Sequence, residues 1–478
     1  MQNRMIYAAA AALIVSGTAL GQDIPDPNPV PNADGTSTWY VGNNTQFPVV
    51  QDVLDACNDG DEIVVVEGQY VESLSINRND VTIRPETLGG SDNTWRPVVF
   101  WNPTEGFNND NGHAMLAGPN TSNTYIGRPR EFAQLANGDI VASEVPVAGA
   151  SDREWVSTAT YTDVCNTVYT DASSRTSLQD GLDANGNLAM TFWSRSIDDV
   201  AIRTNDSDAT FNYCAISSQN GFGGGILVTG ATDASSFVGC TVTRTWSGGQ
   251  QNDGAPVHAV SIQGGSPMFA GCTVGSSVTG DGNVGGAGGV IAHNGGSANW
   301  TGCTIEGNIS PVSDGIYVCN GGATATFSSC DFNSNTSRFG TIYFDSTGLD
   351  SNDYMLVTNS VFDSNDTIDN QYGAVAYCTD AVAGRSPMFV MDRCTLSNTG
   401  QDDGTQSGTE WFETDVVSNY FPRYRVLRDV SSGVIAADTE SAGVAAGDGS
   451  VSGIVGDLNG DNVVDGQDLA VLLGAWGG

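Results

Sequence analysis

The chain has 478 residues, with 55 acidic and 17 basic residues and a formal net charge of −38 at pH 7. All 17 basic residues are arginine. This balance excludes nucleic acid and anionic membranes as partners, and the absence of lysine excludes Schiff-base chemistry on a lysine. Sixty glycines suit many tight turns, and 39% hydrophobic residues suffice for a core of short stacked strands.

Residues 1–21 have the pattern of a secretory signal peptide. Arg4 precedes an apolar stretch, and small residues stand just before Gln22. No cysteine follows that site to take a lipid, and no later run approaches the roughly 20 apolar residues of a membrane span. We therefore expect export to the extracellular space or the cell surface, without a transmembrane anchor.

A short helix is predicted over residues 48–57. Val50, Val53, Leu54 and Cys57 fall at positions i, i+3, i+4 and i+7, which is the spacing of an amphipathic helix. Turn residues and alternating patterns then predict further strands at 62–66, 70–76 and 81–84. Residues 104–209, rich in Asn, Asp, Ser and Thr, are expected to form irregular coils and long loops.

One phrase recurs seven times between residues 210 and 397. An aromatic or apolar residue is followed by two small or polar residues, an anchor, any residue and a further apolar residue. Successive anchors lie 26, 32, 31, 27, 30 and 34 residues apart, a near-fixed period that indicates stacked coils. The anchor and the apolar residue two positions later share one face of a strand. The anchors are Cys214, Cys240, Cys272, Cys303, Cys330, Ser360 and Cys394.

A second apolar phrase, usually opened by glycine, falls between the anchors and predicts another strand in each coil. Its variable spacing from the anchors is typical of loops that project from a solenoid. The six copies begin at Ile226, Val260, Val290, Ile316, Ile342 and Val375.

The repeats resemble a known fold. Three copies run into Asn308, Asn335 and Asn365 and are each followed by a Gly-led strand, like the FxxN and GGAI phrases of polymorphic outer membrane proteins and, more widely, the right-handed parallel β-helix repeat. The helix and the following GDEIVVVEGQYVES are similar to the capped start of pectin-lyase-like β-helices. The resemblance implies an all-β, single-stranded right-handed parallel β-helix over residues 36–435, closed at its start by a helical cap.

The ten cysteines admit three interpretations. Inward cysteines at one coil position most simply form a ladder of small buried hydrophobic side chains. Disulfides between neighbouring rungs are the second interpretation, because rungs lie about 4.8 Å apart. Metal binding or reactivity is the third, although no CxxC or Cys/His ligand spacing is present.

Two residues are predicted to form a platform for a glycan. If Ile316 and Val318 point inward, Tyr317 points outward, and Tyr343 does so one coil later. Their rings would then offer a flat contact for the apolar face of a sugar. The alternative is that outward aromatic side chains only cover their neighbours. His293, Cys319 and Asp345 lie two residues beyond the outward positions of successive coils. This line superficially suggests a catalytic relay.

The C-terminal segment carries a calcium-loop pattern. Oxygen ligands at loop positions 1, 3, 5, 7, 9 and 12 have the EF-hand spacing. The segment 454–478 resembles one half of a type I dockerin, with Asp at the last ligand position and Asn462 where an EF-hand prefers glycine. The resemblance implies Ca²⁺ binding and a cohesin-like or sorting receptor, although no second dockerin half is present. The predicted ligands are Asp457, Asn459, Asp461, the Val463 carbonyl, Asp465 and Asp468.

An amphipathic stripe follows the calcium loop, which predicts a short helix that must bury its apolar face against a partner. Residues 436–453, built mainly from small residues, are expected to be a flexible linker that tethers this module. The stripe is formed by Leu469, Leu472, Leu473 and Trp476.

The predicted function is a structural, adhesive or glycan-contacting role at the cell surface or outside the cell. The alternative is a polysaccharide-degrading enzyme, either a polysaccharide lyase or a glycoside hydrolase of the pectin-lyase-like fold. No ordered set of polygalacturonase motifs, GxSxG elbow or HExxH is present, so no catalytic residue is assigned. The net charge of −38 is unfavourable for an anionic glycan unless calcium bridges the two.

Overall fold

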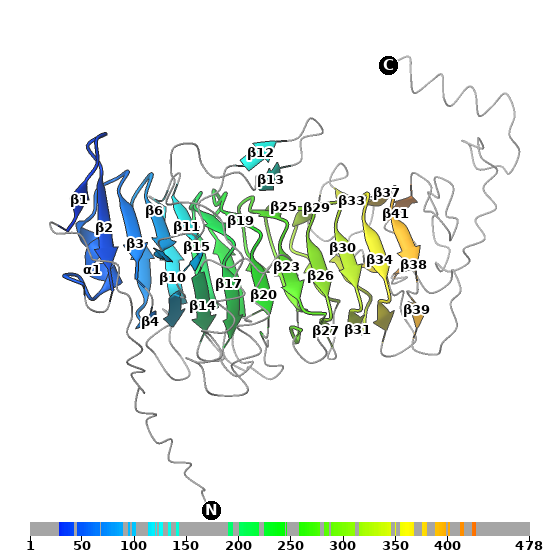
Figure 1. Ribbon diagram of the computed structural model, residues 1–478. Coiled ribbons are helices and arrows are strands. Elements are labelled where there is room, and N and C mark those ends of the chain that lie inside the picture. The colour runs from blue at the N-terminus through cyan, green and yellow to red at the C-terminus, as the bar shows by residue number, and fades with distance from the viewer. Residues whose placement is uncertain are drawn as a thin grey trace, which may run out of the picture.

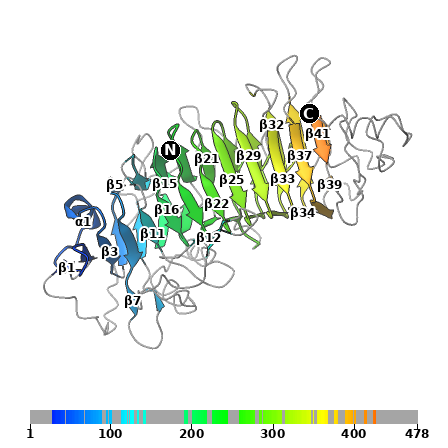
Figure 2. The same ribbon diagram turned by 90° about the horizontal axis from the view of Figure 1, so that it is seen from above.

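The computed structural model describes residues between 28 and 426, with gaps of which the largest are 143–189, 246–257 and 102–112. This part of the chain is an elongated solenoid in which each turn lies beside the next (Figure 1). Figure 2 shows the same order from above, from the helix α1 (Val50–Ala56) at one end to strand β41 (Arg423–Val426) at the other. Among the described residues, no helix is long and apolar enough to cross a membrane.

Three long sheets run along the solenoid, and we call them sheets A, B and C in the order in which a coil visits them. Sheet A consists of β1 (Val30–Pro31), β2 (Ser37–Val41), β3 (Glu62–Val65), β6 (Thr82–Pro85), β11 (Tyr125–Gly127), β16 (Thr210–Asn212), β19 (Ser236–Val238), β22 (Met268–Ala270), β25 (Ser297–Thr301), β29 (Thr324–Ser328), β33 (Tyr354–Thr358), β37 (Met388–Asp392) and β41 (Arg423–Val426). Sheet B consists of β4 (Gly68–Val71), β9 (Val98–Trp101), β14 (Met190–Ser194), β17 (Ala215–Ser218), β20 (Thr241–Thr243), β23 (Thr273–Gly275), β26 (Thr304–Glu306), β30 (Asp331–Asn333), β34 (Val361–Asp363) and β38 (Thr395–Ser397). Sheet C consists of β5 (Leu74–Ile76), β10 (His113–Ala117), β15 (Val200–Asn205), β18 (Gly224–Thr229), β21 (Val260–Ile262), β24 (Ile291–His293), β28 (Tyr317–Cys319), β32 (Ile342–Asp345), β36 (Ala376–Thr379) and β40 (Phe412–Thr414).

Neighbouring strands in these sheets pair in parallel, apart from the antiparallel pair β1 and β2. The described part of the chain is therefore a parallel β-helix. A short parallel sheet, sheet D, joins sheets B and C in four coils and consists of β27 (Ile309–Ser310), β31 (Thr336–Ser337), β35 (Asp366–Thr367) and β39 (Gly400–Gln401). Two antiparallel hairpins interrupt the repeat and comprise β7 (Thr87–Leu88) with β8 (Thr94–Trp95), and β12 (Phe132–Gln134) with β13 (Ile140–Ala142).

The seven anchors predicted from the sequence all lie at the corner between sheets A and B. The residue before each anchor is in the left-handed region, with φ between 49° and 59°. This conformation is unfavourable for most L-residues, so a glycine or asparagine is preferred there. The seven residues are Tyr213, Gly239, Gly271, Gly302, Ser329, Asn359 and Arg393.

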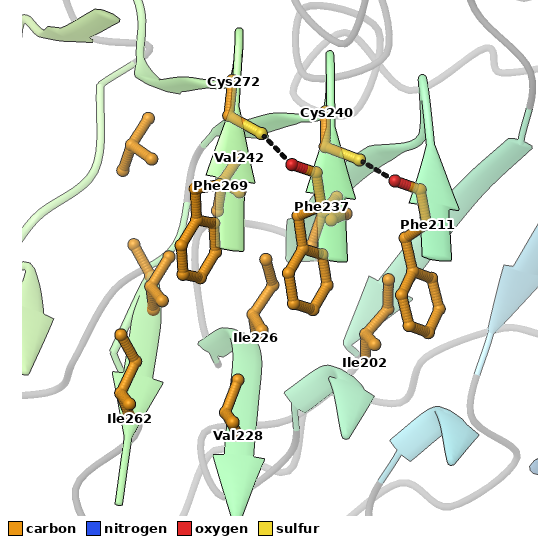
Figure 3. Close-up of a cluster of buried hydrophobic side chains, with 14 of the residues drawn as sticks. Ile202, Phe211, Ile226, Val228, Phe237, Cys240, Val242, Ile262, Phe269 and Cys272 are labelled. Atoms are coloured by element: carbon orange, nitrogen blue, oxygen red, sulfur yellow. Dashed lines mark hydrogen bonds between the residues drawn. The ribbon is translucent and has the colours of Figure 1, made fainter. Parts of the chain in front are cut away.

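Behind this corner the core is built from stacks of like side chains (Figure 3). Phe211, Phe237 and Phe269 stack at 5.1 Å between successive ring centroids, and Trp300 continues the stack 3.9 Å from Phe269. Because each coil repeats the same inward position, burial of one ring also covers a face of the next.

The anchor cysteines form the buried ladder that the repeat predicted. The six anchor cysteines are all buried and free of disulfides. The thiols of Cys240, Cys272 and Cys303 donate to carbonyls of the preceding coil at 3.2–3.4 Å. Burial raises the pKa of the Cys272 thiol well above its ordinary value, so this thiol remains protonated.

Cys303 provides a test of this packing role. Ser360 occupies the same corner position in another coil, where its hydroxyl donates to the Thr358 carbonyl at 2.8 Å. We expect Cys303→Ala to lower the free energy of unfolding by about 1 kcal/mol. Cys303→Ser should cost less, because a hydroxyl can make the same kind of bond. Chemical denaturation measures both, and mass spectrometry that finds a Cys272–Cys303 disulfide would overturn the ladder.

Asparagines form a second buried stack at the end of sheet B. Asn308 donates through Nδ2 to the Val274 carbonyl at 2.9 Å and to Oδ1 of Asn335 at 3.0 Å. Asn335 repeats both bonds to Ile305 and Asn365. The amide groups are therefore satisfied between coils, which explains the FxxN phrase in physical terms.

The helix and most strands predicted over residues 48–84 are present. Helix α1 lies within the predicted segment, and its buried residues join the core at the first coils. The strand predicted over 70–76 is two strands, β4 and β5, because the chain turns between sheets B and C. The prediction of irregular coils for 104–209 is wrong where β10, β11, β14 and β15 continue the three sheets, while 143–189 lie outside the described residues.

Candidate functional site

The side chains of sheet C alternate differently from the sequence prediction in two coils. The N–H groups of Ile316 and Tyr317 both donate to the carbonyl of Thr341, at 3.1 and 2.9 Å. Val290 and Ile291 share the Ile316 carbonyl in the same way, at 3.1 and 2.8 Å. Two residues opposite one define a β-bulge, and the extra residue shifts the later side chains to the other face.

This bulge turns Tyr317 into the core, so its predicted place on an outward platform is wrong. Tyr317 is fully buried, and its ring meets Trp300 and Phe327 edge to face at 5.9 and 4.9 Å. Its hydroxyl lies 2.8 Å from Nδ1 of His293. Burial raises the pKa of Tyr317 well above its ordinary value, with a smaller contribution from Cys319.

The line of His293, Cys319 and Asp345 does not form a relay. His293 and Cys319 pair in register and are fully buried, with Sγ 3.9 Å from Nδ1. The next residue in that register is Phe344, and Asp345 is half-buried one position further along β32. Burial lowers the pKa of His293 to about 4, so the imidazole is neutral near pH 7. A buried neutral group without access to substrate has no role as a surface acid or base.

Tyr343 faces outward as predicted, and its aromatic neighbour is Tyr377. The register of sheet C places these two residues side by side in β32 and β36. Their rings stack at 5.5 Å between centroids and 22° between planes. At this distance and angle the rings overlap face to face instead of lying side by side in one plane. Tyr377 is only 7% exposed and supports Tyr343, which remains half-buried.

Phe339 completes this group at the corner that precedes β32. Its ring lies 6.1 Å from that of Tyr343 and 5.3 Å from that of Tyr377. The guanidinium of Arg338 lies over the Phe339 ring, 5.5 Å from the centroid. We call Arg338, Phe339, Tyr343 and Tyr377 the aromatic cluster. It combines partly accessible ring area with a cation, and the Asp345 carboxylate follows two residues after Tyr343 on the same side of β32.

Sheet B carries acidic side chains on its outer side, among them Glu306 and Asp331. Asp331 pairs with Thr304 in the register of the sheet, and Glu306 is two residues along from Thr304. Burial raises the pKa of Glu306, and the nearby charge of Asp331 adds to the rise. Burial also raises the pKa of Asp331. Within the described residues, no three His, Cys, Asp or Glu side chains are grouped so that they could hold a metal ion.

The predicted calcium ligands lie outside the described residues. These are the oxygens of Asp457, Asn459, Asp461, Val463, Asp465 and Asp468.

Comparisons with known proteins find only distant structural likenesses. No family model matches the chain, and no curated protein matches it. A pectin methylesterase solved with a hexasaccharide shares 11% identity at a TM-score of 0.25, over 82% of this chain and 92% of that one. Alginate lyase from Paenibacillus sp. str. FPU-7 shares 11% identity at a TM-score of 0.25, over 74% of this chain and 92% of that one. Endo-xylogalacturonan hydrolase from Aspergillus tubingensis shares 11% identity at a TM-score of 0.23, over 82% of this chain and 100% of that one. At such low scores, the β-helix assignment depends on the parallel register described above.

The sequence prediction missed Tyr377, Phe339 and Arg338. Tyr377 ends the apolar phrase that begins at Val375, and the register places it opposite Tyr343. One signal was present in the sequence, since Gly289 and Gly315 stand immediately before the two bulges. Glycine inside a strand pattern is typical of a bulge or of a close backbone approach. A Cβ on Gly315 would lie 2.9 Å from the backbone nitrogen of Tyr343.

Proposed function

We propose that this protein is an exported, non-catalytic β-helix that contacts uncharged polysaccharides through the aromatic cluster. The observation that carries this proposal is the partly accessible ring area of Tyr343 and Phe339, which both pack against Tyr377. Aromatic rings bind the apolar faces of sugars, and neighbouring polar groups bind their hydroxyls. Arg338 and Asp345 stand where they can supply those polar contacts.

The net charge favours an uncharged ligand. A protein with a formal charge of −38 repels polyanions such as pectate or alginate over several ångströms of solution. The one arginine of the aromatic cluster, Arg338, offsets little of this repulsion. Neutral glycans are therefore the class that the cluster is expected to bind without a bridging cation.

The two ends of the chain have separate roles in this proposed function. Helix α1 acts as a cap that keeps the first coil from pairing with other strands. The solenoid is right-handed, as are nearly all parallel crossover connections. Export follows from residues 1–21, and residues 454–478 form a dockerin-like module. This module binds Ca²⁺ and attaches the protein to a cohesin-like or sorting receptor.

Tyr343→Ala tests the glycan contact. Affinity electrophoresis in gels that contain hydroxyethylcellulose, xyloglucan or mixed-linkage glucan measures retention of the parent and the variant. Loss of one ring contact of about 1 kcal/mol should weaken binding about fivefold. Tyr343→Phe should retain most of the binding, because it keeps the ring.

Tyr213→Ala is the matched control, since Tyr213 is also a half-buried tyrosine but lies at a corner of a coil that is distant in sequence from Tyr343. It should bind as the parent does. Equal retention of the parent and Tyr343→Ala on every glycan that the parent binds would remove the aromatic cluster as a binding site.

A second candidate function, hydrolysis of a polysaccharide, is favoured by the two outward carboxyl groups of Glu306 and Asp331. Raised pKa values let a carboxylic acid keep its proton for donation to a leaving group. The release of reducing ends from the same glycans discriminates between the two functions. The non-catalytic proposal expects none above the level of a protein-free control.

A further inference from the structure

Part of sheet A contains no charged residue on its strands. Six consecutive strands, β16, β19, β22, β25, β29 and β33, contain no Asp, Glu, Arg or His. The same coils carry acidic residues on the other sheets, such as Glu306 on sheet B and Asp345 on sheet C. In a chain with a net charge of −38, this segregation leaves the strands of sheet A uncharged over six successive coils.

Two neighbouring strands make up the accessible centre of that side. In β25 and β29, small or aromatic side chains point inward and alternate with exposed or half-buried polar ones. Their register pairs Ser297 with Thr324, Asn299 with Thr326, and Thr301 with Ser328. We call these six residues the neutral face. The paired side chains stand about 4.8 Å apart across the strands, on a regular sheet.

The hydrogen-bonding groups of the neutral face are available to a ligand. None of the six side chains hydrogen-bonds to another group in the described part of the protein. Elsewhere, surface threonines are engaged, as when Thr232 donates to Asp206 at 2.8 Å and Thr229 donates to the Thr204 carbonyl at 2.8 Å. Each hydroxyl and amide of the neutral face can both donate and accept.

We propose that the neutral face is a second docking surface, and that it takes an uncharged polysaccharide. The chemistry of the face selects this occupant. A cationic partner would be drawn to the acidic sheets instead, and an anionic one would be repelled by the net charge. An apolar partner would leave six polar groups without hydrogen bonds. A neutral glycan offers donors and acceptors of both kinds and little charge to desolvate.

The neutral face and the aromatic cluster lie on different sheets, A and C. One molecule that holds a separate glycan on each sheet would cross-link the two. This consequence depends on the proposed function, whereas binding at the neutral face itself does not.

The test uses the full-length protein and suspensions of microcrystalline cellulose and insoluble mannan. Thr326→Asp places a carboxylate at the centre of the neutral face and should weaken binding at this face at least tenfold. Thr273→Asp is the matched control, since it adds the same charge at a half-buried threonine of sheet B. It should bind as the parent does. Circular dichroism and the melting temperature establish that both variants are folded.

Cross-linking separates the two surfaces. The parent should clump the particles, while Thr326→Asp and Tyr343→Ala should each bind them without clumping. Equal effects of Thr326→Asp and Thr273→Asp would overturn the neutral face, as would loss of all binding in Tyr343→Ala. Full binding by Tyr343→Ala together with loss of binding in Thr326→Asp would retain the neutral face and remove the aromatic cluster. Failure of the parent to bind any uncharged particle would overturn both.

Discussion

Lowering the pH from 7 to 4 is expected to remove about 3 kcal/mol of stability through one residue, His293. Its imidazole is fully buried, and burial lowers its pKa from 6.5 to about 4. In the unfolded chain the same group takes up a proton near pH 6.5. Between these two values the unfolded state binds more protons than the folded state. The free energy of unfolding contributed by His293 is therefore fully present above about pH 6.5, and is lost as the pH falls towards 4.

The other titrating groups make the comparison with a variant essential. Glu306 and Asp331 have raised pKa values, so their contributions change with pH in the opposite direction. Denaturant unfolding of the parent and of His293→Gln at pH 7 and pH 4.5 isolates the contribution of the histidine.

His293→Gln should show a smaller loss of stability on acidification than the parent. Ile291→Val is the control, since it alters the same strand in the core and should lower stability without changing its pH dependence. An identical pH dependence in His293→Gln and the parent would contradict the account of a buried neutral imidazole.

Asp461→Ala is expected to abolish calcium binding by the C-terminal module. Calcium needs six to eight oxygen ligands, and the side chain at loop position 5 supplies one of them together with a negative charge. Its loss should weaken binding by on the order of 100-fold or more. Calorimetric titration of full-length protein with CaCl₂ measures the change, and Asp457→Ala should behave in the same way.

A linker carboxylate provides the control for this titration. Asp448 lies in residues 436–453, outside the predicted loop, and Asp448→Ala should take up calcium as the parent does. Unchanged uptake by both loop variants would show that this segment does not hold the ion.

Every position of the repeating corner could be predicted from the sequence, because every coil meets the same two structural requirements there. The position before the anchor must accept a left-handed backbone, and the anchor must be small and buried. Such demands leave a recurring phrase, from Cys214 to Cys394. Strands β10 and β14 left no such phrase, since long insertions separate them from their neighbours in the sheets.

The aromatic cluster was only half predictable, for a different reason. Ile316 and Tyr317 are both apolar enough for the core, so alternation alone fits either register. The bulge that buries both is decided by hydrogen bonds to Thr341 in the next coil, a contact across 24 residues or more that no local pattern contains. The same bulge removed Tyr317 from the surface and left Tyr343 to pair with Tyr377.

The shared corner also bears on how such a chain can change over evolutionary time. Residues 272–302 form one complete turn, which enters and leaves at the same point of the repeat. Removal or duplication of that segment would leave the aromatic residue, the left-handed corner residue and the anchor cysteine of the flanking turns in matching positions. A gene encoding this architecture can therefore lengthen or shorten its product by whole turns, whereas the same edit in a globular sheet would separate strands from their partners.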